Sequence, residues 1–345
     1  VFQLVEKVFV KLFEKFSDTY TVNKNFPIIR FDQSMEWYGT DKPDLRNPIK
    51  MMNVSDFFAS SEFKIFADIL TKDGTQIKAI PAKGGGSRKF CDRMNRFAQE
   101  HGLPGMGYIF WRSNDNGDVE AAGPIAKNLG EEKTEKLRDF LGLSKGDAAF
   151  FLGGIPDHFN DIASKSRDTI GLELGITNTD SYEFCWITDF QMYEKNTDTG
   201  KVEFSHNPFS MPKVDLLSDD IDPLSVLGMQ YDLSCNGYEI LSGAIRNHKL
   251  DNLFKAFEIA GYAKEEVESQ FSGLVNALKY GAPPHGGCAA GIDRIVMLLA
   301  KEDNIREVIM FPMNQRAEDP MLGSPRTPTT EQLDELKLKI IDHDL

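Results

Sequence analysis

Two acidic residues that flank a tight turn have the types and spacing to do chemistry. Asp232 and Glu239 lie on either side of Asn236-Gly237, and this dipeptide between alternating apolar runs predicts a β-hairpin. With a two-residue turn, Ser234 faces Glu239, and Gln230 and Asp232 lie on the same polar face. Two carboxylates on one face can hold a divalent cation such as Mg²⁺ against phosphates. A solvated outer face of a sheet explains the pattern equally well.

An arginine further along the hairpin has the wrong parity to join these acids. Regular pairing puts Leu233 opposite Ile240, so Arg246 points to the other side of the sheet. A β-bulge, for which Gly243 is the candidate, would reset the alternation and bring the arginine to the acidic face. Whether Arg246 belongs to the same site therefore depends on that bulge.

A glycine-rich segment at residues 286–294 ends in Asp293 and Arg294 and directly precedes an apolar run. We expect a turn that leads into a helix, where the backbone can approach a ligand because no side chain intervenes. A helix N-terminus suits anionic groups, and Arg294 can bind phosphate or stack on a base. A turn before a buried helix, without any ligand, is the commoner meaning of such spacing. The segment has neither the Walker pattern nor the dinucleotide-binding pattern.

Composition places the chain among ordinary globular proteins. Its 345 residues suffice for about two domains. The formal net charge of −14 argues against nucleic-acid binding driven by bulk charge. No apolar run reaches membrane-spanning length, and the four cysteines form no C-x-x-C pair. We expect reduced thiols, no membrane association and a cytoplasmic location.

Periodicity gives the order of the elements. Residues 1–16 predict an amphipathic helix with one apolar stripe, and the lack of a capping residue before it suggests further sequence upstream. Residues 54–155 alternate strand-like and helix-like runs, which is typical of a compact module. Within it, a glycine loop fits a helix N-cap at Ser87 better than a phosphate cradle. We also expect one helix over residues 264–280 and a final strand over residues 305–311.

Six motifs, in a fixed order along the chain, resemble those of bacterial-type aspartyl-tRNA synthetases, which belong to class II of the aminoacyl-tRNA synthetases. The motifs are Tyr38-Gly39-Thr40-Asp41-Lys42-Pro43-Asp44-Leu45-Arg46, Trp186-Ile187-Thr188-Asp189-Phe190, His206-Asn207-Pro208-Phe209, Asn236-Gly237-Tyr238-Glu239, Tyr280-Gly281-Ala282-Pro283-Pro284-His285 and Gly291-Ile292-Asp293-Arg294. The last is similar to the motif 3 of that class. The resemblance covers essentially the whole chain.

The resemblance implies an α+β fold, with an antiparallel sheet flanked by helices. Residues 1–53 and 156–345 would form the catalytic domain, and residues 54–155 an inserted domain shared with a subunit of tRNA-dependent amidotransferases. It further implies a set of site residues. Asp232 and Glu239 would bind Mg²⁺; Glu239, Gly291, Ile292, Asp293 and Arg294 would bind ATP; His206 and Arg246 would bind aspartate; Glu239 and Arg294 would be catalytic.

The implied function is ATP-dependent activation of L-aspartate, followed by its transfer to tRNA(Asp), with tRNA(Asn) left open. A homodimer is expected for the full-length protein. Asn207 and Ala290 depart from a histidine and a phenylalanine that many relatives have. Motifs 1 and 2 and the anticodon-binding domain would lie upstream, so we expect an incomplete active site. The alternative is a stand-alone, non-catalytic relative that binds tRNA or a protein partner.

Overall fold

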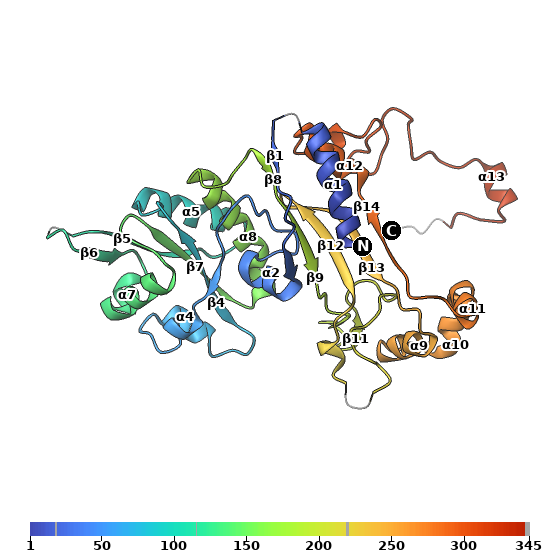
Figure 1. Cartoon of the computed structure of the whole chain (residues 1–345), viewed down its shortest axis with the longest axis horizontal. Coiled ribbons are helices and arrows are strands. Elements are labelled where there is room, and N and C mark those ends of the chain that lie inside the picture. Colours follow the sequence, from blue (N-terminus) through green and yellow to red (C-terminus); the bar gives the residue numbers. More distant parts are fainter. Residues whose placement is uncertain (18, 115, 219–220, 342–345) are drawn as a thin grey trace. The chain divides into compact units, whose positions relative to one another are not determined.

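The computed structural model describes residues 1–17, 19–114, 116–218 and 221–341 (Figure 1). The chain forms two compact units, Val1–Ala290 and Gly291–Leu345. The helices of the first unit are α1 (Phe2–Phe16), α2 (Phe31–Tyr38), α3 (Ser55–Phe58), α4 (Lys64–Ile69), α5 (Arg88–Glu100), α6 (Ala126–Leu129), α7 (Glu131–Phe140), α8 (Pro156–Glu173), the 3₁₀ helix η1 (Pro223–Ser225), α9 (Leu250–Ile259), α10 (Lys264–Gln270) and α11 (Ser272–Lys279). The second unit contains α12 (Ile292–Ala300), the 3₁₀ helix η2 (Ile305–Glu307) and α13 (Thr330–Glu335).

The described strands all belong to the first unit. They are β1 (Thr21–Val22), β2 (Ile28–Arg30), β3 (Met52–Asn53), β4 (Gln76–Ala82), β5 (Gly107–Ser113), β6 (Val119–Ala122), β7 (Ala148–Gly154), β8 (Ser181–Tyr182), β9 (Phe184–Thr188), β10 (Tyr193–Lys195), β11 (Val202–Phe204), β12 (Gln230–Cys235), β13 (Tyr238–Ile245) and β14 (Gly286–Ala290). The pairs β1–β8 and β10–β11 form two small sheets.

The first large sheet has the strand order β14-β13-β12-β9-β2 and is antiparallel except where β2 runs parallel to β9. Strand β9 alternates between two covered faces. On one face, Trp186 stacks on Phe2 of α1 with ring centroids 4.1 Å apart. On the other, Cys185 and Ile187 join a buried cluster with Tyr38 of α2. The expected antiparallel sheet flanked by helices is therefore confirmed.

The second large sheet has the order β3-β4-β7-β5-β6, and all its pairings are antiparallel. Both faces are covered by hydrophobic clusters. Residues of α5 and α8 pack on one face, and residues of α3, α4, α6 and α7 pack on the other. Ser87 caps α5, because its side chain accepts a hydrogen bond from the Phe90 amide. The predicted N-cap is confirmed, while the domain boundaries at 54 and 155 stay predictions.

Two sequence-based expectations in the C-terminal part are wrong. The single helix over residues 264–280 is two helices, α10 and α11, that meet at Phe271. There the backbone leaves helical geometry, and the Phe271 ring packs against Phe209 and Phe257 at 5.2 Å and 5.5 Å. The strand expected over residues 305–311 is absent: residues 305–307 form the short 3₁₀ helix η2, capped by Asn304, and residues 308–311 form neither helix nor strand. Met310 stays 84% exposed, so no buried sheet position favours a strand here.

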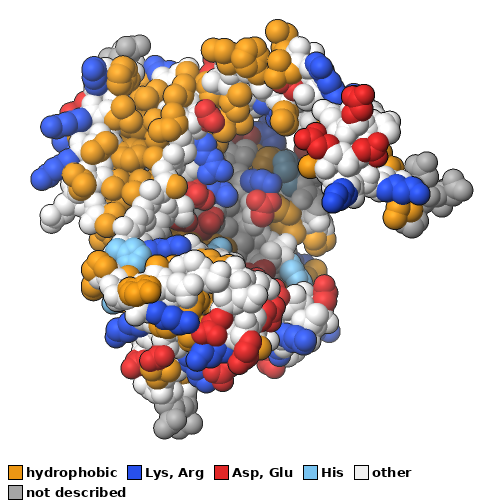
Figure 2. Space-filling view, turned by 90° about the vertical axis from the view of Figure 1, so that its right-hand side faces the viewer, with side chains coloured by type: hydrophobic (Ala, Val, Ile, Leu, Met, Phe, Trp, Pro, Cys, Tyr) orange, Lys and Arg blue, Asp and Glu red, His pale blue; other side chains and the backbone are white. Residues whose placement is uncertain are grey.

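The apolar stripe of α1 divides into a buried part and an exposed part. Phe9 and Phe13 are buried, whereas Leu4 is 70% and Val8 54% exposed. Other large hydrophobic side chains are also exposed, and Figure 2 shows a face on which hydrophobic side chains gather. Periodicity identified the helix correctly, but it did not separate the two parts of the stripe. Among the described residues, no helix is long and apolar enough to cross a membrane.

Gly171 of α8 lies where another segment comes close to the helix. A Cβ at this position would lie 2.4 Å from Nδ2 of Asn47, which no native contact allows. We predict that Gly171→Ala lowers the free energy of unfolding by about 1–3 kcal/mol, because Asn47 must move. The control is Gly273→Ala in α11, where nothing lies within 4 Å of the added Cβ, so stability should rise by about 0.5–1 kcal/mol. Urea unfolding measures both, and equal effects would contradict the prediction.

Candidate active site

The hairpin predicted around Asn236-Gly237 is confirmed as β12 and β13. Both turn residues have positive φ, 51° and 89°, which is the geometry that favours Asn-Gly. Ser234 pairs with Glu239, as expected from the two-residue turn. The next pair is Leu233 with Leu241, so the pairing of Leu233 with Ile240 is wrong. Ile240 is the extra residue of a β-bulge.

This bulge decides which side chains share a face. Beyond it, Asp232 pairs with Ser242 and Gln230 with Ala244. Because side chains alternate along a strand, Arg246 then falls on the same face as Asp232. The arginine therefore joins the acids, as the hypothesis of a bulge required. The predicted position of the bulge, Gly243, is wrong: Gly243 pairs regularly with Tyr231, and a Cβ there would clash with the Tyr231 ring at 2.5 Å.

A cavity of about 680 Å³ lies on this polar face of the sheet. It brings together four of the site residues expected from the sequence, His206, Asp232, Glu239 and Arg246. The other lining residues are Asp41, Phe190, Asn207, Gln230, Ser242, Gly243, Ala244, His285, Gly286, Gly287, Cys288 and Ala289. All of them belong to the first unit.

Negative charge concentrates on one side of the cavity. Burial raises the pKa of Asp232 to about 6; a hydrogen bond with Ser242 lowers it, whereas the charges of Glu239 and Asp41 raise it further. Three carboxylates thus line one cavity, and one of them holds its proton more tightly than an ordinary aspartate. Such a site favours a cation or the ammonium group of a ligand.

Arg246 and His206 are both held by aromatic rings. The guanidinium carbon of Arg246 lies 5.3 Å from the centroid of the Phe209 ring, and its backbone amide donates to the His285 carbonyl at 2.9 Å. The His206 ring meets the edge of Phe190 at 5.3 Å between centroids. These contacts hold Arg246 and His206 in the wall of the cavity that the three carboxylates also line. A planar guanidinium in such a place can bind a carboxylate through two parallel hydrogen bonds.

Asp41, Gln230, Ser242 and His285 line the cavity, but the sequence alone did not mark them as site residues. Asp41 lies in the polar segment that follows α2, which was one of the six resemblance motifs but in which no residue was given a role. The regular register expected from the sequence placed Ser242 on the apolar face, whereas the bulge brings it opposite Asp232. Gln230 is buried, and its side-chain amide donates to the Asn207 carbonyl at 3.3 Å. The departure at Asn207 thus lies within the cavity wall.

The glycine-rich segment 286–294 is not a single turn. Its first five residues form β14, the edge strand that pairs with β13, so the expected turn is wrong for this part. The reason is close approach: a Cβ on Gly286 would lie 2.8 Å from the Ala244 carbonyl oxygen, and Tyr231 donates its hydroxyl proton to the Gly287 carbonyl at 3.0 Å. The remaining residues, Gly291, Ile292, Asp293 and Arg294, begin the second unit, where Gly291 is the N-cap position of α12.

The carboxylates of the cavity fit a magnesium ion whose coordination shell is completed by water and by oxygens of a ligand. No group of three or more His, Cys, Asp or Glu residues forms a metal cage within the described parts of the chain. Mg²⁺, however, usually takes only one or two protein carboxylates and completes its shell with water and phosphate oxygens. Asp232 and Glu239 supply that number. The pKa of Asp232 is raised mainly by burial and further by the charges of Glu239 and Asp41, and a cation would offset both effects.

Comparison with known proteins identifies the family of this chain. Residues 1–315 match the family described as tRNA synthetases class II (D, K and N). The chain belongs to this family. A curated relative from Roseobacter denitrificans is 61% identical over 344 residues, and one from Dinoroseobacter shibae is 63% identical over 341 residues. Both carry the name aspartate–tRNA(Asp/Asn) ligase. The match covers 100% and 99% of this chain, which spans 58% of the length of each relative.

Solved structures of an aspartyl-tRNA synthetase and an asparaginyl-tRNA synthetase are also similar to smaller parts of this chain. The aspartyl-tRNA synthetase from Entamoeba histolytica is 26% identical with a TM-score of 0.32, and the match covers 45% of this chain and 27% of that one. The asparaginyl-tRNA synthetase from the same organism is 18% identical with a TM-score of 0.32, covering 71% and 48%.

Asp232→Asn tests the charge in the cavity. The pKa of Asp232 is about 6 in the folded state and about 4 in an unfolded chain. The folded state therefore binds the proton more tightly, and the stability that this proton contributes is lost as the pH rises from about 4 to about 6. We predict that Asp232→Asn is more stable than the wild type above pH 6, by on the order of 1 kcal/mol, and equally stable below pH 4.

Urea unfolding across pH 4 to 8 measures this difference. The matched control is Asp139→Asn, an exposed aspartate that pairs with Arg138 on the surface, and its effect should be small at every pH. If the Asp232→Asn variant were less stable than the wild type at pH 7.5, the raised pKa assigned to Asp232 would be wrong.

Proposed function

We propose that this chain forms part of an aspartate–tRNA ligase, which activates L-aspartate with ATP and then transfers it to tRNA. The observation that carries the proposal is the shared cavity: Asp232, Glu239, His206 and Arg246 line it together. Membership of the class II family and the names of the relatives support the same activity. The substrates would be ATP, aspartate and tRNA(Asp), with tRNA(Asn) as the second acceptor that the relatives' name suggests.

Aspartate recognition would use both signs of charge in the cavity. Arg246 would bind the side-chain carboxylate through its planar fork, and a neutral asparagine side chain would bind less well there. His206 would contact the same substrate. The ammonium group needs an acceptor, and Asp41 lines the cavity as a carboxylate not assigned to the metal. Aspartate would thus be held by groups of opposite charge at its two ends.

Activation would depend on positioning and on neutralising charge. One oxygen of the aspartate α-carboxylate attacks the α-phosphorus of ATP, and pyrophosphate leaves; the terminal ribose hydroxyl of tRNA then attacks the activated carbonyl, and AMP leaves. Neither step needs a nucleophile from the protein. Asp232 and Glu239 would hold Mg²⁺, which offsets phosphate charge. Gly291, Ile292, Asp293 and Arg294 would contact the nucleotide, with Arg294 and Glu239 acting at the reacting phosphates.

The larger organisation follows from the same proposal. Residues 54–155 would be an inserted domain between two parts of the catalytic domain, residues 1–53 and 156–345. The separate sheet built from β3 to β7 supports that division. The ligase would be a cytoplasmic homodimer.

Aspartate-dependent exchange of pyrophosphate into ATP tests the function directly. It should be measured on this chain and on a longer protein of the relatives' length that contains it. We predict exchange in the longer protein and little or none in the chain alone, because much of the site would lie outside it. The absence of exchange in the longer protein would refute the enzyme and favour a non-catalytic tRNA-binding or protein-binding relative.

Arg246→Leu in the longer protein tests aspartate recognition. We expect the KM for aspartate to rise about 100-fold or more, because a charge-assisted fork to a carboxylate is lost. The KM for ATP should change little. The control is Arg112→Leu, an exposed arginine of β5 that pairs with Glu120. An unchanged KM for aspartate in Arg246→Leu would exclude the assigned role.

A further inference from the structure

A fully buried arginine outside the cavity holds an irregular segment of the chain. The side chain of Arg167, in α8, has 0% exposure. Its Nε donates to the Ile49 carbonyl at 2.7 Å, and its Nη2 donates to the carbonyls of Asp44 and Asn47 at 2.9 Å and 2.6 Å. One guanidinium thus satisfies three backbone acceptors of residues 39–49, a segment without helix or strand. We call residues 39–49 the clamped segment.

The clamped segment also lies against the backbone of α8 at two points. Nδ2 of Asn47 donates to the Arg167 carbonyl at 2.8 Å, and the absence of a side chain at Gly171 makes room for it. At the other end, a Cβ on Gly39 would lie 2.7 Å from the Asn160 carbonyl oxygen. The segment therefore lies directly against the backbone of α8 along several turns.

The charge of Arg167 is compensated where it lies. Nη1 donates to Asp168 at 2.7 Å, and the guanidinium carbon is 4.8 Å from the centroid of the Tyr38 ring. Burial raises the pKa of Asp168 to about 6, against the opposing effect of Arg167. A buried cation with this set of partners is costly to rearrange. A lysine has a single donor nitrogen and cannot reach three carbonyls and a carboxylate at once.

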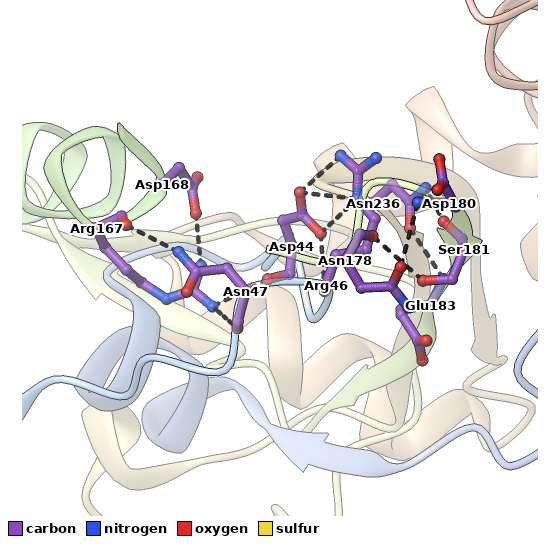
Figure 3. Close-up of polar contacts among 10 residues, drawn as sticks. All are labelled: Asp44, Arg46, Asn47, Arg167, Asp168, Asn178, Asp180, Ser181, Glu183 and Asn236. Atoms are coloured by element: carbon purple, nitrogen blue, oxygen red, sulfur yellow. Dashed lines mark hydrogen bonds and ion pairs between the residues drawn. The ribbon is translucent and has the colours of Figure 1, made fainter. Parts of the chain in front are cut away.

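The clamped segment reaches the cavity at Asp41 and approaches the turn of the β12–β13 hairpin at Asp44. Asp41 lines the cavity. Asp44 forms an ion pair with Arg46 at 2.8 Å, and a Cβ on Gly237 would lie 3.7 Å from the Asp44 Cβ. Gly237 is in the turn of the hairpin that carries both metal-binding candidates. Figure 3 shows Asp44 and Arg46 between the group around Arg167 and the group around Asn236.

The other side of α8 belongs to the second large sheet. Phe159, Ala163 and Ile170 of α8 lie in a buried cluster with β4, β5 and β7. One helix is therefore fixed to that sheet by its apolar side and to the clamped segment by Arg167. We propose that Arg167 is a positioning residue for aspartate binding, which holds the clamped segment so that Asp41 faces the cavity. This inference rests on the proposed function and adds to it a link between the sheet of β3–β7 and the site.

The first test measures backbone hydrogen exchange in this whole chain without any ligand. The reporters are the amides of Arg46, Asn47 and Ile49, which bond within the clamped segment. We expect Arg167→Lys and Arg167→Ala to accelerate their exchange at least about 10-fold while the amides of β4 and β7 keep their protection. Methylguanidinium, which fits the space left in Arg167→Ala, should restore part of the protection. The control is Arg93→Ala, because Arg93 pairs with Glu173 of the same helix but touches no part of the segment.

The second test measures pyrophosphate exchange in the longer protein with Arg167→Lys. We expect the KM for aspartate to rise about 10-fold and the KM for ATP to change less than about twofold. If the exchange rates of the reporter amides did not change, or if the amides of β4 and β7 exchanged equally faster, the proposal would be overturned. Arg167 would then have a structural role only. Equal increases of both KM values would overturn it as well. If the wild-type longer protein shows no exchange, the proposed function fails, and the amide measurements still decide whether Arg167 positions the segment.

Discussion

A single extra residue in one strand determines the composition of the candidate active site. Without the bulge at Ile240, Arg246 would lie on the face of the sheet that packs against α1, among Tyr231 and Leu233. With it, Gln230, Asp232, Ser242 and Arg246 share one face, and the cavity has an acidic side and a basic group together. Tyr231, on the other face of β12, packs on Phe2 of α1 with ring centroids 5.2 Å apart. One local irregularity thus decides which side chains share the polar face.

Two buried cations tie the sheet of β3–β7 to the segments that lead into the site. Arg167 binds the carbonyls of the clamped segment, and Lys78 of β4 donates to the Met35 carbonyl at 2.7 Å and to Asn160 at 3.0 Å. Burial lowers the pKa of Lys78 to about 8. Desolvating two cations opposes stability, and hydrophobic substitutes of similar size often stabilise a protein as well or better. Their hydrogen bonds are directional and fix the positions of particular backbone carbonyls, which apolar packing cannot do.

The two faces of strand β9 show how the rest of the fold supports this arrangement. Phe184 and Trp186 pack against the aromatic side chains of α1, whereas Ile187 faces the side of α2 and pairs with Asp232 across the sheet. The apolar contact on one face attaches α1 to the sheet. The opposite face is apolar where Cys185 and Ile187 pack near Tyr38 of α2, and it carries charged groups on the neighbouring strands β12 and β13.

Signals that act over a few residues could be interpreted from the sequence alone. Asn236-Gly237 determined the hairpin, Ser87 the start of α5, and the spacing of apolar residues the helix α1, because each depends on local backbone geometry. The bulge at Ile240, the break at Phe271, the strand formed by residues 286–290 and the place of Asp41 were decided by the tertiary structure. Each of these depends on contacts outside the local pattern: the cross-strand pairing of Leu233 with Leu241, the rings of Phe209 and Phe257, the pairing of residues 286–290 with β13, and the cavity that Asp41 shares with the hairpin. Sequence periodicity carries no record of such contacts, so only the folded chain could supply them.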